Sequence, residues 1–226
     1  GEPTIIERVY WIMEKCVEMG IAKNIELVFN SNMTNIQKRF TDLIEQFKNV
    51  LMCISVDAYG HENEYIRGAS HWSRVEKNLR TYCASNVVGT VLFSPVIQIY
   101  NVLTITKLLD FAEELEEEYG RKIFLTFLIC DYPTSLDFRN CPDQVREVAA
   151  GRLEQWLQRS KILANRPENK QSIEATIKAL KENRKDNWEN ELVTFKKYTE
   201  MLDKQRKESM REALPELWNL MYASNR

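Results

Sequence analysis

Three short groups of residues have types and spacings that could bind a ligand or take part in chemistry. The first is Gly1-Glu2-Pro3, which directly precedes a helical pattern. A flexible Gly1 could let the backbone approach a ligand, and the Glu2 carboxylate could receive an ammonium group. Because a single Gly or Pro usually marks a turn, this group alone favours a turn before a helix over a binding site.

The second group is the run Asn-Ser-Asn-Met-Thr at residues 30–34, between a predicted strand and a predicted helix. Ser31 and Asn32 carry small hydrogen-bonding side chains, which could contact a ribose hydroxyl or a carboxylate of a ligand. The same side chains could equally cap the helix that follows.

In the third group, Ser55 and Asp57 lie two residues apart at the end of the next apolar run, so they point to the same side of a strand. Arg67 follows ten residues after Asp57 and could close over this strand end as a carboxylate clamp. A surface salt bridge is the alternative, and the residues alone leave both interpretations open.

These groups lie along an alternating series of strands and helices. Short apolar runs predict strands, and apolar residues at helical spacing predict helices. The predicted strands span residues 24–30, 50–56, 87–97 and 123–130, and the predicted helices span residues 5–20, 36–47, 72–83 and 103–119. Residues 4–7 and 34–37 have capping-box spacing, which predicts that the first two helices begin there. Residues 57–68 are predicted to form a loop.

Strands separated by single helices pair in parallel, because a long crossover returns the chain in the same direction. The sequence therefore predicts an α/β fold with a layer of parallel strands, or part of a (β/α) barrel. Functional loops of such sheets lie at the carboxyl ends of the strands. We therefore expect residues 31–32, 57–68, 98–101 and 131–140 to share one rim.

The pattern changes after Pro142. Residues 145–163 predict an amphipathic helix, residues 165–167 break it, and residues 172–222 combine many charges with an apolar stripe at helical spacing. Pro215 predicts a break between two helices in this tail. We expect two domains, with residues 142–226 forming a helical region packed on residues 1–141.

Composition narrows the class of protein. Lys and Arg total 31 and Asp and Glu total 33, so the formal net charge of −2 gives no reason to expect nucleic acid or an anionic membrane as a partner. No apolar run approaches the roughly 18 residues that a membrane span needs. The five cysteines are odd in number and widely spread, which predicts a reducing cytoplasm rather than a disulfide framework.

The three groups occur in the order and spacing of radical S-adenosylmethionine (radical SAM) enzymes. Gly1-Glu2-Pro3 resembles the latter part of the Gly-Gly-Glu-Pro motif of that family, and residues 30–34 resemble its Asn-Thr-Asn-Gly-Thr strand end. Ser55-Val56-Asp57 is similar to the Ser-Val-Asp-Gly strand end, and residues 65–68 to the Tyr-Ile-Arg loop that follows it. Residues 195–217 resemble the end of members with a twitch domain.

The resemblance implies an incomplete (β/α) barrel with a helical twitch-like tail, as part of an Fe–S oxidoreductase. S-adenosylmethionine would lie across the carboxyl ends of the strands and chelate a [4Fe–4S] cluster. Its reductive cleavage would yield a 5′-deoxyadenosyl radical that abstracts hydrogen from a substrate. The implied cofactor-binding residues and roles are Gly1 and Glu2 for the amino group, Ser31 and Asn32 for ribose or carboxylate, Ser55 and Asp57 for the rim, and Arg67 for the carboxylate.

The sequence also departs from the family pattern. Met33 and Ala58 stand where the family usually has Gly, and the signature Cys-x-x-x-Cys-x-x-Cys is absent. We therefore expect a carboxy-terminal fragment, inactive alone, whose cluster-binding cysteines lie upstream. Cys130 and Cys141 lie eleven apart and could join an auxiliary cluster with Cys53 or Cys83, but the lack of a close pair favours buried or loop thiols.

Two other function classes stay open. One is a non-catalytic α/β binding module that recognises a protein or peptide partner. The other is an ordinary α/β enzyme that uses Asp57 and Arg67 on a phosphorylated substrate, although no Gly-rich phosphate loop supports it. For the radical SAM interpretation the substrate is unknown, and a peptide, a protein side chain or a small metabolite would each be compatible.

Overall fold

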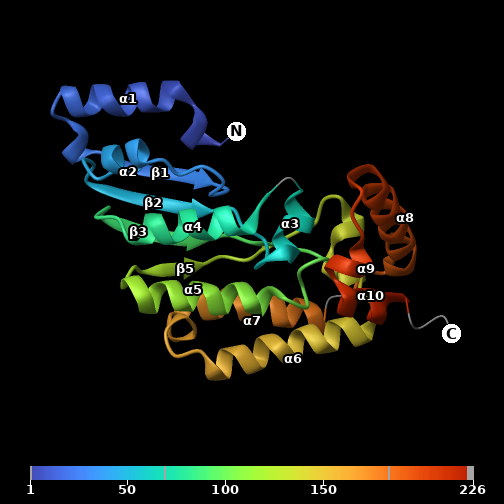
Figure 1. Cartoon of the computed structure of the whole chain (residues 1–226). Coiled ribbons are helices and arrows are strands. Elements are labelled where there is room, and N and C mark those ends of the chain that lie inside the picture. Colours follow the sequence, from blue (N-terminus) through green and yellow to red (C-terminus); the bar gives the residue numbers. More distant parts are fainter. Residues whose placement is uncertain (1, 69, 183, 223–226) are drawn as a thin grey trace.

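A sheet of parallel strands forms the centre of the protein. The computed structural model describes residues 2–68, 70–182 and 184–222 (Figure 1). Four strands lie in the order β1-β2-β3-β5, and every neighbouring pair is parallel. A second parallel pair, β4 and β6, follows directly beyond β3 and β5. The bounds of the strands are Glu26–Ser31 for β1, Asn49–Ile54 for β2, Gly89–Phe93 for β3, Val96–Ile97 for β4, Ile123–Leu125 for β5 and Leu128–Ile129 for β6.

The predicted α/β fold with parallel pairing is confirmed, but the predicted third and fourth strands are each interrupted. The fourth, predicted over residues 123–130, divides into β5 and β6. Residues 87–97 do not form one strand, because β3 ends before Ser94 and β4 begins after Pro95. Proline has no N–H to donate to a neighbouring strand, so the ladder breaks at this position.

Helices connect the strands. Their bounds are Glu7–Glu18 for α1, Lys38–Ile44 for α2, His61–Arg67 for α3, Trp72–Cys83 for α4 and Ile105–Tyr119 for α5. The predicted loop at residues 57–68 is wrong in its second half, which forms α3. This helix begins after Gly60, whose φ of 69° lets the chain turn sharply after the strand.

Both predicted capping boxes are also wrong. Helix α1 begins after Ile6 and α2 after Gln37, and neither start has a side-chain cap. The two threonines serve other contacts, because the Thr4 hydroxyl donates to Glu2 and the Thr34 hydroxyl donates to Asn32. Contacts with residues two positions earlier in the sequence therefore replace the predicted helix caps.

The helices cover one face of the sheet. In β2, Val50, Met52 and Ile54 are completely buried, whereas Leu51 and Cys53 between them are half-buried. Because side chains alternate along a strand, the two sets lie on opposite faces. Within β1, Phe29 packs edge-to-face on Phe40 of α2, while its neighbour Val28 points away and is 64% exposed. The described residues leave this second face partly open.

The chain ends in further helices. Their bounds are Asp143–Arg159 for α6, Pro167–Glu182 for α7, Trp188–Arg206 for α8, Met210–Ala213 for α9 and Pro215–Tyr222 for α10. The break predicted at Pro215 is confirmed. Helix α7 packs along α6 and β5, and α8 packs on two short 3-10 turns, Thr134–Leu136 and Phe138–Asn140. The domain division after residue 141 stays a prediction.

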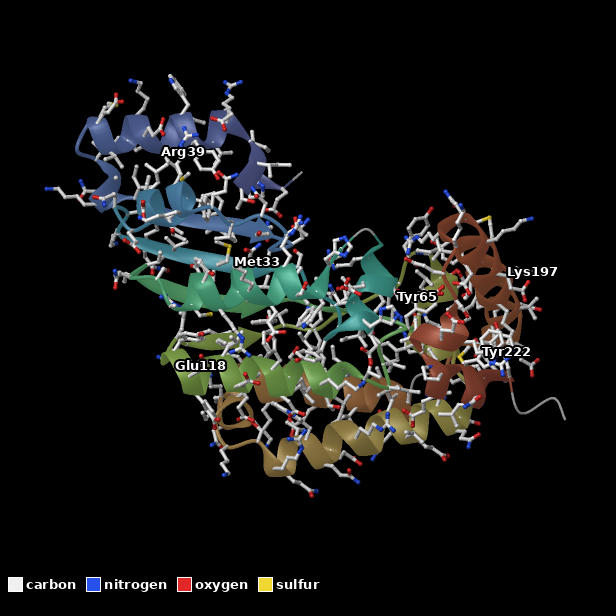
Figure 2. The ribbon with its side chains drawn as sticks, in the orientation of Figure 1. Met33, Arg39, Tyr65, Glu118, Lys197 and Tyr222 are labelled. Atoms are coloured by element: carbon white, nitrogen blue, oxygen red, sulfur yellow. The ribbon has the colours of Figure 1, made fainter. Side chains whose placement is uncertain are left out.

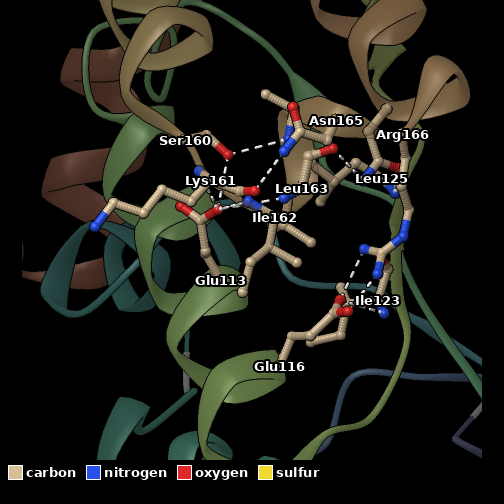
Figure 3. A network of polar contacts seen from close by, with 12 residues as sticks. Glu113, Glu116, Ile123, Leu125, Ser160, Lys161, Ile162, Leu163, Asn165 and Arg166 are labelled. Atoms are coloured by element: carbon tan, nitrogen blue, oxygen red, sulfur yellow. Dashed lines mark hydrogen bonds and ion pairs between the residues drawn. The ribbon is translucent and has the colours of Figure 1, made fainter.

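Side chains from α5 and α7 complete the β5 end of the sheet (Figure 3). Arg166, directly before α7, forms a paired contact with Glu116 of α5 and also donates to the carbonyl oxygen of Ile123. The neighbouring Glu113 accepts hydrogen bonds from the Ser160 hydroxyl and from the amides of Lys161, Ile162 and Leu163. These carboxylates connect α5 to the turn between α6 and α7.

Two further side chains of α7 bind the backbone of the same strand region. The Leu125 amide donates to Asn169 Oδ1 at 2.7 Å, and the Phe127 amide donates to Ser172 Oγ at 2.7 Å. Asn169 is fully buried, and its Nδ2 donates to the carbonyl oxygen of Leu163. The backbone at this edge therefore finds partners within the chain, as buried backbone groups require.

Across the parts of the chain that the structure describes, every helix is either too short or too polar to cross a bilayer.

Candidate functional site

The carboxyl end of β1 binds the side chain of Glu2. Ser31 Oγ donates to Glu2 Oε1 at 2.8 Å, and the Asn32 amide donates to Glu2 Oε2 at 2.8 Å. Thr4 adds its hydroxyl at 2.8 Å and its amide at 3.4 Å to Oε1. The structure thus brings together Glu2, Ser31 and Asn32 from two separate sequence groups, while Gly1 lies outside the described residues.

The turn after β1 has an unusual backbone at Met33. This residue has a φ of 58°, in the left-handed region that glycine adopts readily and larger residues rarely adopt. Two local contacts hold the turn, since the Met33 amide donates to Ser31 Oγ and the Thr34 amide donates to Asn32 Oδ1. The Met33 side chain is completely buried, and Figure 2 shows it beside the strand end. Burial of the side chain compensates for the backbone strain.

The end of β2 carries the third sequence group. Arg67 Nε lies 2.9 Å from Asp57 Oδ2, which makes an ion pair, although the N–H direction does not give a hydrogen bond. Asp57 is 5% exposed, and its Oδ1 accepts from the Val96 amide at 2.9 Å. The Arg67 side chain remains 26% exposed. Arg67 and Asp57 therefore form the salt bridge given above as the alternative to a ligand clamp, with Arg67 at the solvent side of the pair.

Two buried asparagines hold Asp57 in place, and sequence reasoning missed both. The Asp57 amide donates to Asn63 Oδ1 at 3.1 Å. Asn101 Nδ2 donates to the carbonyl oxygens of Asp57 and Val96. Asn101 lies in the segment 98–101 that was expected at the rim, but the fact that it is fully buried could not be read from the sequence.

The two strand ends lie next to each other. The Ser55 amide donates to the carbonyl oxygen of Ser31 at 2.8 Å, which directly joins the segment holding Glu2 to the segment leading to Asp57. The ladder continues to the next strand, where the Ser94 amide donates to the Ile54 carbonyl oxygen. The predicted rim at β1 and β2 is therefore formed by Ser31, Asn32, Ser55 and Asp57.

The carboxy-terminal helices fix α3, which carries Arg67. The Tyr65 hydroxyl donates to Asp203 Oδ1 at 2.8 Å, and Arg206 Nη1 donates to the Tyr65 carbonyl oxygen at 2.9 Å. Burial and the bond to Asp203 raise the pKa of Tyr65, so the phenol stays protonated and remains a donor. Figure 2 shows Tyr65 facing the helical tail. Asp203 and Arg206 of α8 thus help to position the rim from a distant part of the sequence.

All five cysteines are free, and none takes part in the rim hydrogen bonds described above. Burial raises the pKa of Cys53, Cys83, Cys130 and Cys141, which keeps these thiols protonated near neutral pH. Within residues 2–68, 70–182 and 184–222, no group of three or more His, Cys, Asp or Glu side chains is arranged to hold a metal ion.

No family model, curated protein or solved structure matches this chain. The arrangement of the rim residues is therefore the basis on which a function is proposed.

Proposed function

We propose that this chain is the carboxy-terminal part of a radical SAM Fe–S oxidoreductase, and that the ends of β1 and β2 hold S-adenosylmethionine. The observation that carries the proposal is the meeting of Glu2 with Ser31 and Asn32, beside the Asp57–Arg67 pair on the neighbouring strand. These are the residues that the family resemblance selects from three separate segments.

Glu2 and Arg67 each have a free group to offer a ligand. Glu2 Oε1 accepts three hydrogen bonds, whereas Oε2 accepts one from Asn32, which leaves an acceptor position for the amino group of the methionine moiety. Arg67 is partly exposed and can turn its guanidinium toward a carboxylate. Ser31, Asn32 and Ser55 line the strand ends between these two charges.

The left-handed backbone at Met33 supports the same proposal. The resemblance aligns Met33 with a glycine of the family motif, and its φ of 58° is a conformation that favours glycine. A glycine at this position would adopt the same backbone conformation without strain.

The proposed parent is a partial (β/α) barrel whose remaining strands come from outside this chain. Two features support this architecture, the open second face of the sheet and β1, which pairs with β2 alone among the described residues. Parallel sheets are usually buried on both faces. A cofactor and a substrate held against the open face would bury it.

The iron–sulfur cluster does not fit the cysteines of this chain, since burial raises the pKa of four of them and no described group of three suits a metal. We assign its ligands to residues outside the chain. A bound cluster would supply the electron that cleaves the sulfonium of S-adenosylmethionine. All five cysteines are free, which is consistent with a reducing cytoplasm.

A specific observation favours the alternative of a non-catalytic binding module. On α1 and its carboxyl end, Ile12 and Met19 lie seven residues apart and are 48% and 69% exposed, and Trp11 beside Ile12 is 56% exposed. Ile5, in the 3-10 turn before the helix, is 62% exposed. Residues seven apart lie on the same face of a helix, and exposed apolar patches of this kind mark interaction surfaces. A protein partner could bind there.

A binding experiment on this chain tests the proposed cofactor site. Amide and arginine Nε–H signals are followed by ¹H–¹⁵N NMR during addition of S-adenosylmethionine. We expect saturable shifts at Asn32, Asp57 and Arg67, and weaker binding by at least about tenfold in R67M, which loses the charge-assisted contact.

R74M is the matched control, since Arg74 is an exposed arginine on α4. It should bind like the unmodified chain. Absence of saturable shifts at the strand ends, or equal binding by R67M, would contradict the proposed site.

A further inference from the structure

Helix α3 carries Arg67 at its last position, and a glycine flanks each end of the helix. Gly60 has a φ of 69° and Gly68 has a φ of 49°, both in the left-handed region that glycine adopts readily. The start of the helix has no side-chain cap. A helix of seven residues between two such glycines is too short to hold its own direction, so contacts with other elements must orient it.

The ion pair with Asp57 does not by itself fix the direction of Arg67. Nε lies 2.9 Å from Asp57 Oδ2 but donates no hydrogen bond to it. Because Nε is buried, a charged contact with a ligand must come from the terminal Nη groups. The position of these groups depends on the orientation of the α3 backbone.

The carboxylate of Asp203 holds the end of α3 from α8. Its Oδ1 accepts from the Tyr65 hydroxyl at 2.8 Å, and its Oδ2 accepts from the Met210 amide at 2.8 Å. The second contact fixes the carboxylate against the start of α9, so both of its oxygens have defined directions. Tyr65 precedes Arg67 by two residues, so this contact lies next to the residue that is proposed to bind the ligand carboxylate.

Packing holds the ring of Tyr65 as firmly as the hydrogen bond holds its hydroxyl. The residue is 2% exposed and packs edge-to-face on Tyr100, with ring centroids 5.5 Å apart. The Tyr100 hydroxyl lies 2.8 Å from Thr199 Oγ1, one turn before Asp203 on α8. A phenylalanine at position 65 would therefore keep the packing and lose only the contact with Asp203.

Arg206 holds the backbone of the same helix end. Its Nη1 donates to the Tyr65 carbonyl oxygen at 2.9 Å, one of the carbonyl groups that a helix leaves unpaired at its end. The guanidinium also packs over Gly68, because a Cβ atom at that glycine would lie 3.2 Å from Arg206 Cζ. Helix α8 thus contacts α3 on both sides of Arg67 in the sequence.

The other half of the proposed site is held by different residues. Glu2 accepts hydrogen bonds from Thr4, Ser31 and Asn32, which all lie in the first part of the chain. Loss of the contact between Tyr65 and Asp203 should therefore weaken the hold of Arg67 on a ligand carboxylate and leave the hold of Glu2 on an amino group unchanged.

We infer that Asp203 is a positioning residue that determines specificity. Through Tyr65 it orients Arg67, so that the site favours a sulfonium nucleotide with a carboxylate over the same nucleotide without one. Because the ligand carboxylate is assigned to Arg67, this role rests on the proposed function. A residue of α8, far from the rim in the sequence, thereby sets the selectivity of the rim.

Calorimetric titration of this chain with S-adenosylmethionine and with decarboxylated S-adenosylmethionine measures that preference. Y65F removes only the hydroxyl that donates to Asp203. It should bind S-adenosylmethionine at least about fivefold more weakly and should change the binding of the decarboxylated form by less than about twofold. In R67M, which lacks the guanidinium, the addition of Y65F should have no further effect.

Y82F is the matched control, since the Tyr82 hydroxyl is buried and has no hydrogen-bond partner among the described residues. It should bind both nucleotides like the unmodified chain. D203N keeps the size of the side chain but offers one oxygen to two donors, so it should repeat the result of Y65F. Thermal unfolding establishes that each variant is folded, and D203N is sufficient for the test if Y65F does not fold.

A second measurement needs no ligand. In the chain with ¹⁵N-labelled arginine, the heteronuclear NOE of the Arg67 Nε–H should fall in Y65F, because Arg67 becomes more mobile, and should stay unchanged in Y82F.

Equal weakening of both nucleotides in Y65F would overturn the inference, since a merely structural role would affect both. Unchanged binding of S-adenosylmethionine in Y65F would overturn it as well. If the unmodified chain bound neither nucleotide, the proposed function and the choice of ligand would fail. The NOE would then decide the positioning role, and an unchanged NOE of Arg67 in Y65F would overturn it.

Discussion

The two edges of the central sheet differ in the contacts that cover them. At β5, the carboxy-terminal helices place Arg166, Asn169 and Ser172 against the backbone of the strand region. At the opposite edge, β1 pairs with β2 alone among the described residues, and its Val28 is 64% exposed. The Glu2 carboxylate binds the carboxyl end of β1.

This difference separates what the chain needs for stability from what it leaves for partners. Buried contacts at β5 should contribute strongly to the free energy of unfolding, because their loss leaves backbone groups without partners. Exposed contacts at β1 should contribute little. The open edge and face are where the proposed cofactor, substrate or further strands would bind.

The largest expected effect is at Asn169. N169A removes both the acceptor for the Leu125 amide and the donor to the Leu163 carbonyl oxygen. Leaving two buried backbone groups unpaired should lower the free energy of unfolding by about 3 to 5 kcal/mol, measured by urea denaturation. N30A, an exposed asparagine of β1, is the matched control and should change stability by less than about 0.5 kcal/mol.

If the two asparagine variants lost similar amounts of stability, the two edges would be equivalent and the comparison would be wrong.

The next effect concerns ion pairs at the two edges. R166M breaks the pair with Glu116, whose side chains are only 18% and 11% exposed, and should cost about 3 kcal/mol. K48M breaks the pair with Glu26, whose side chains are 58% and 57% exposed, and should cost less than about 1 kcal/mol. Chemical denaturation of both variants in the same buffer gives the comparison, and a larger loss in K48M would contradict it.

The pH dependence of stability tests the burial of the Cys83 thiol. Burial raises the pKa of Cys83 from 9.0 to about 11, so folding favours its neutral form. This contribution to stability is fully present below pH 9 and is lost as pH rises toward 11, by up to about 1.4 kcal/mol per pH unit. The measurement is the pH dependence of urea denaturation for the unmodified chain and for C83A, which should lack this component.

Alkylation rates measure how well the two sides of the sheet protect their cysteines. Iodoacetamide at pH 8.5 should modify Cys53, which is half-buried on the open sheet face, faster than Cys83, which is 3% exposed. Faster modification of Cys83 would show that the helices do not protect their side of the sheet.

The smallest expected effect on stability is at Val28. V28K should change the free energy of unfolding by less than about 0.5 kcal/mol in urea denaturation, because the Val28 side chain is 64% exposed. V28T, which keeps the branched shape, is the control for stability. A loss above about 1.5 kcal/mol in V28K would mean that Val28 is packed and the edge is not open.

Much of the fold could be predicted because its signals are local. The buried face of α4, with Trp72, Val75, Leu79, Tyr82 and Cys83, follows the helical spacing expected from the sequence. Gly120 ends α5 in a left-handed conformation, as a glycine after a helix predicts. Such features depend on neighbours a few residues away.

The errors arose where distant contacts decide the structure. Thr4 and Thr34 fit a capping box, but their hydroxyl groups donate to Glu2 and Asn32. Glu2 and Asn32 are in turn held by the contact between Glu2 and the end of β1, about 30 residues away in the sequence. Helix α3 was expected as a loop, and its Tyr65 is held by Asp203, 138 residues away. Hydropathy patterns contain no information about such partners.

Only some residues of the candidate site could be predicted from the sequence. Residue types and spacing selected Ser31, Asn32, Asp57 and Arg67, and the strand order then brought them to neighbouring ends. The asparagines that fix Asp57 could not be selected, because Asn63 and Asn101 act through buried backbone contacts that leave no motif.

The most direct test of the radical SAM proposal uses the full coding sequence that contains this chain. The protein is purified without oxygen, incubated with iron and sulfide, and reduced in the presence of S-adenosylmethionine. We predict a bound [4Fe–4S] cluster and release of 5′-deoxyadenosine, with a loss of at least about tenfold in R67M and unchanged release in R74M. A protein that binds no cluster and releases no 5′-deoxyadenosine would contradict the proposal.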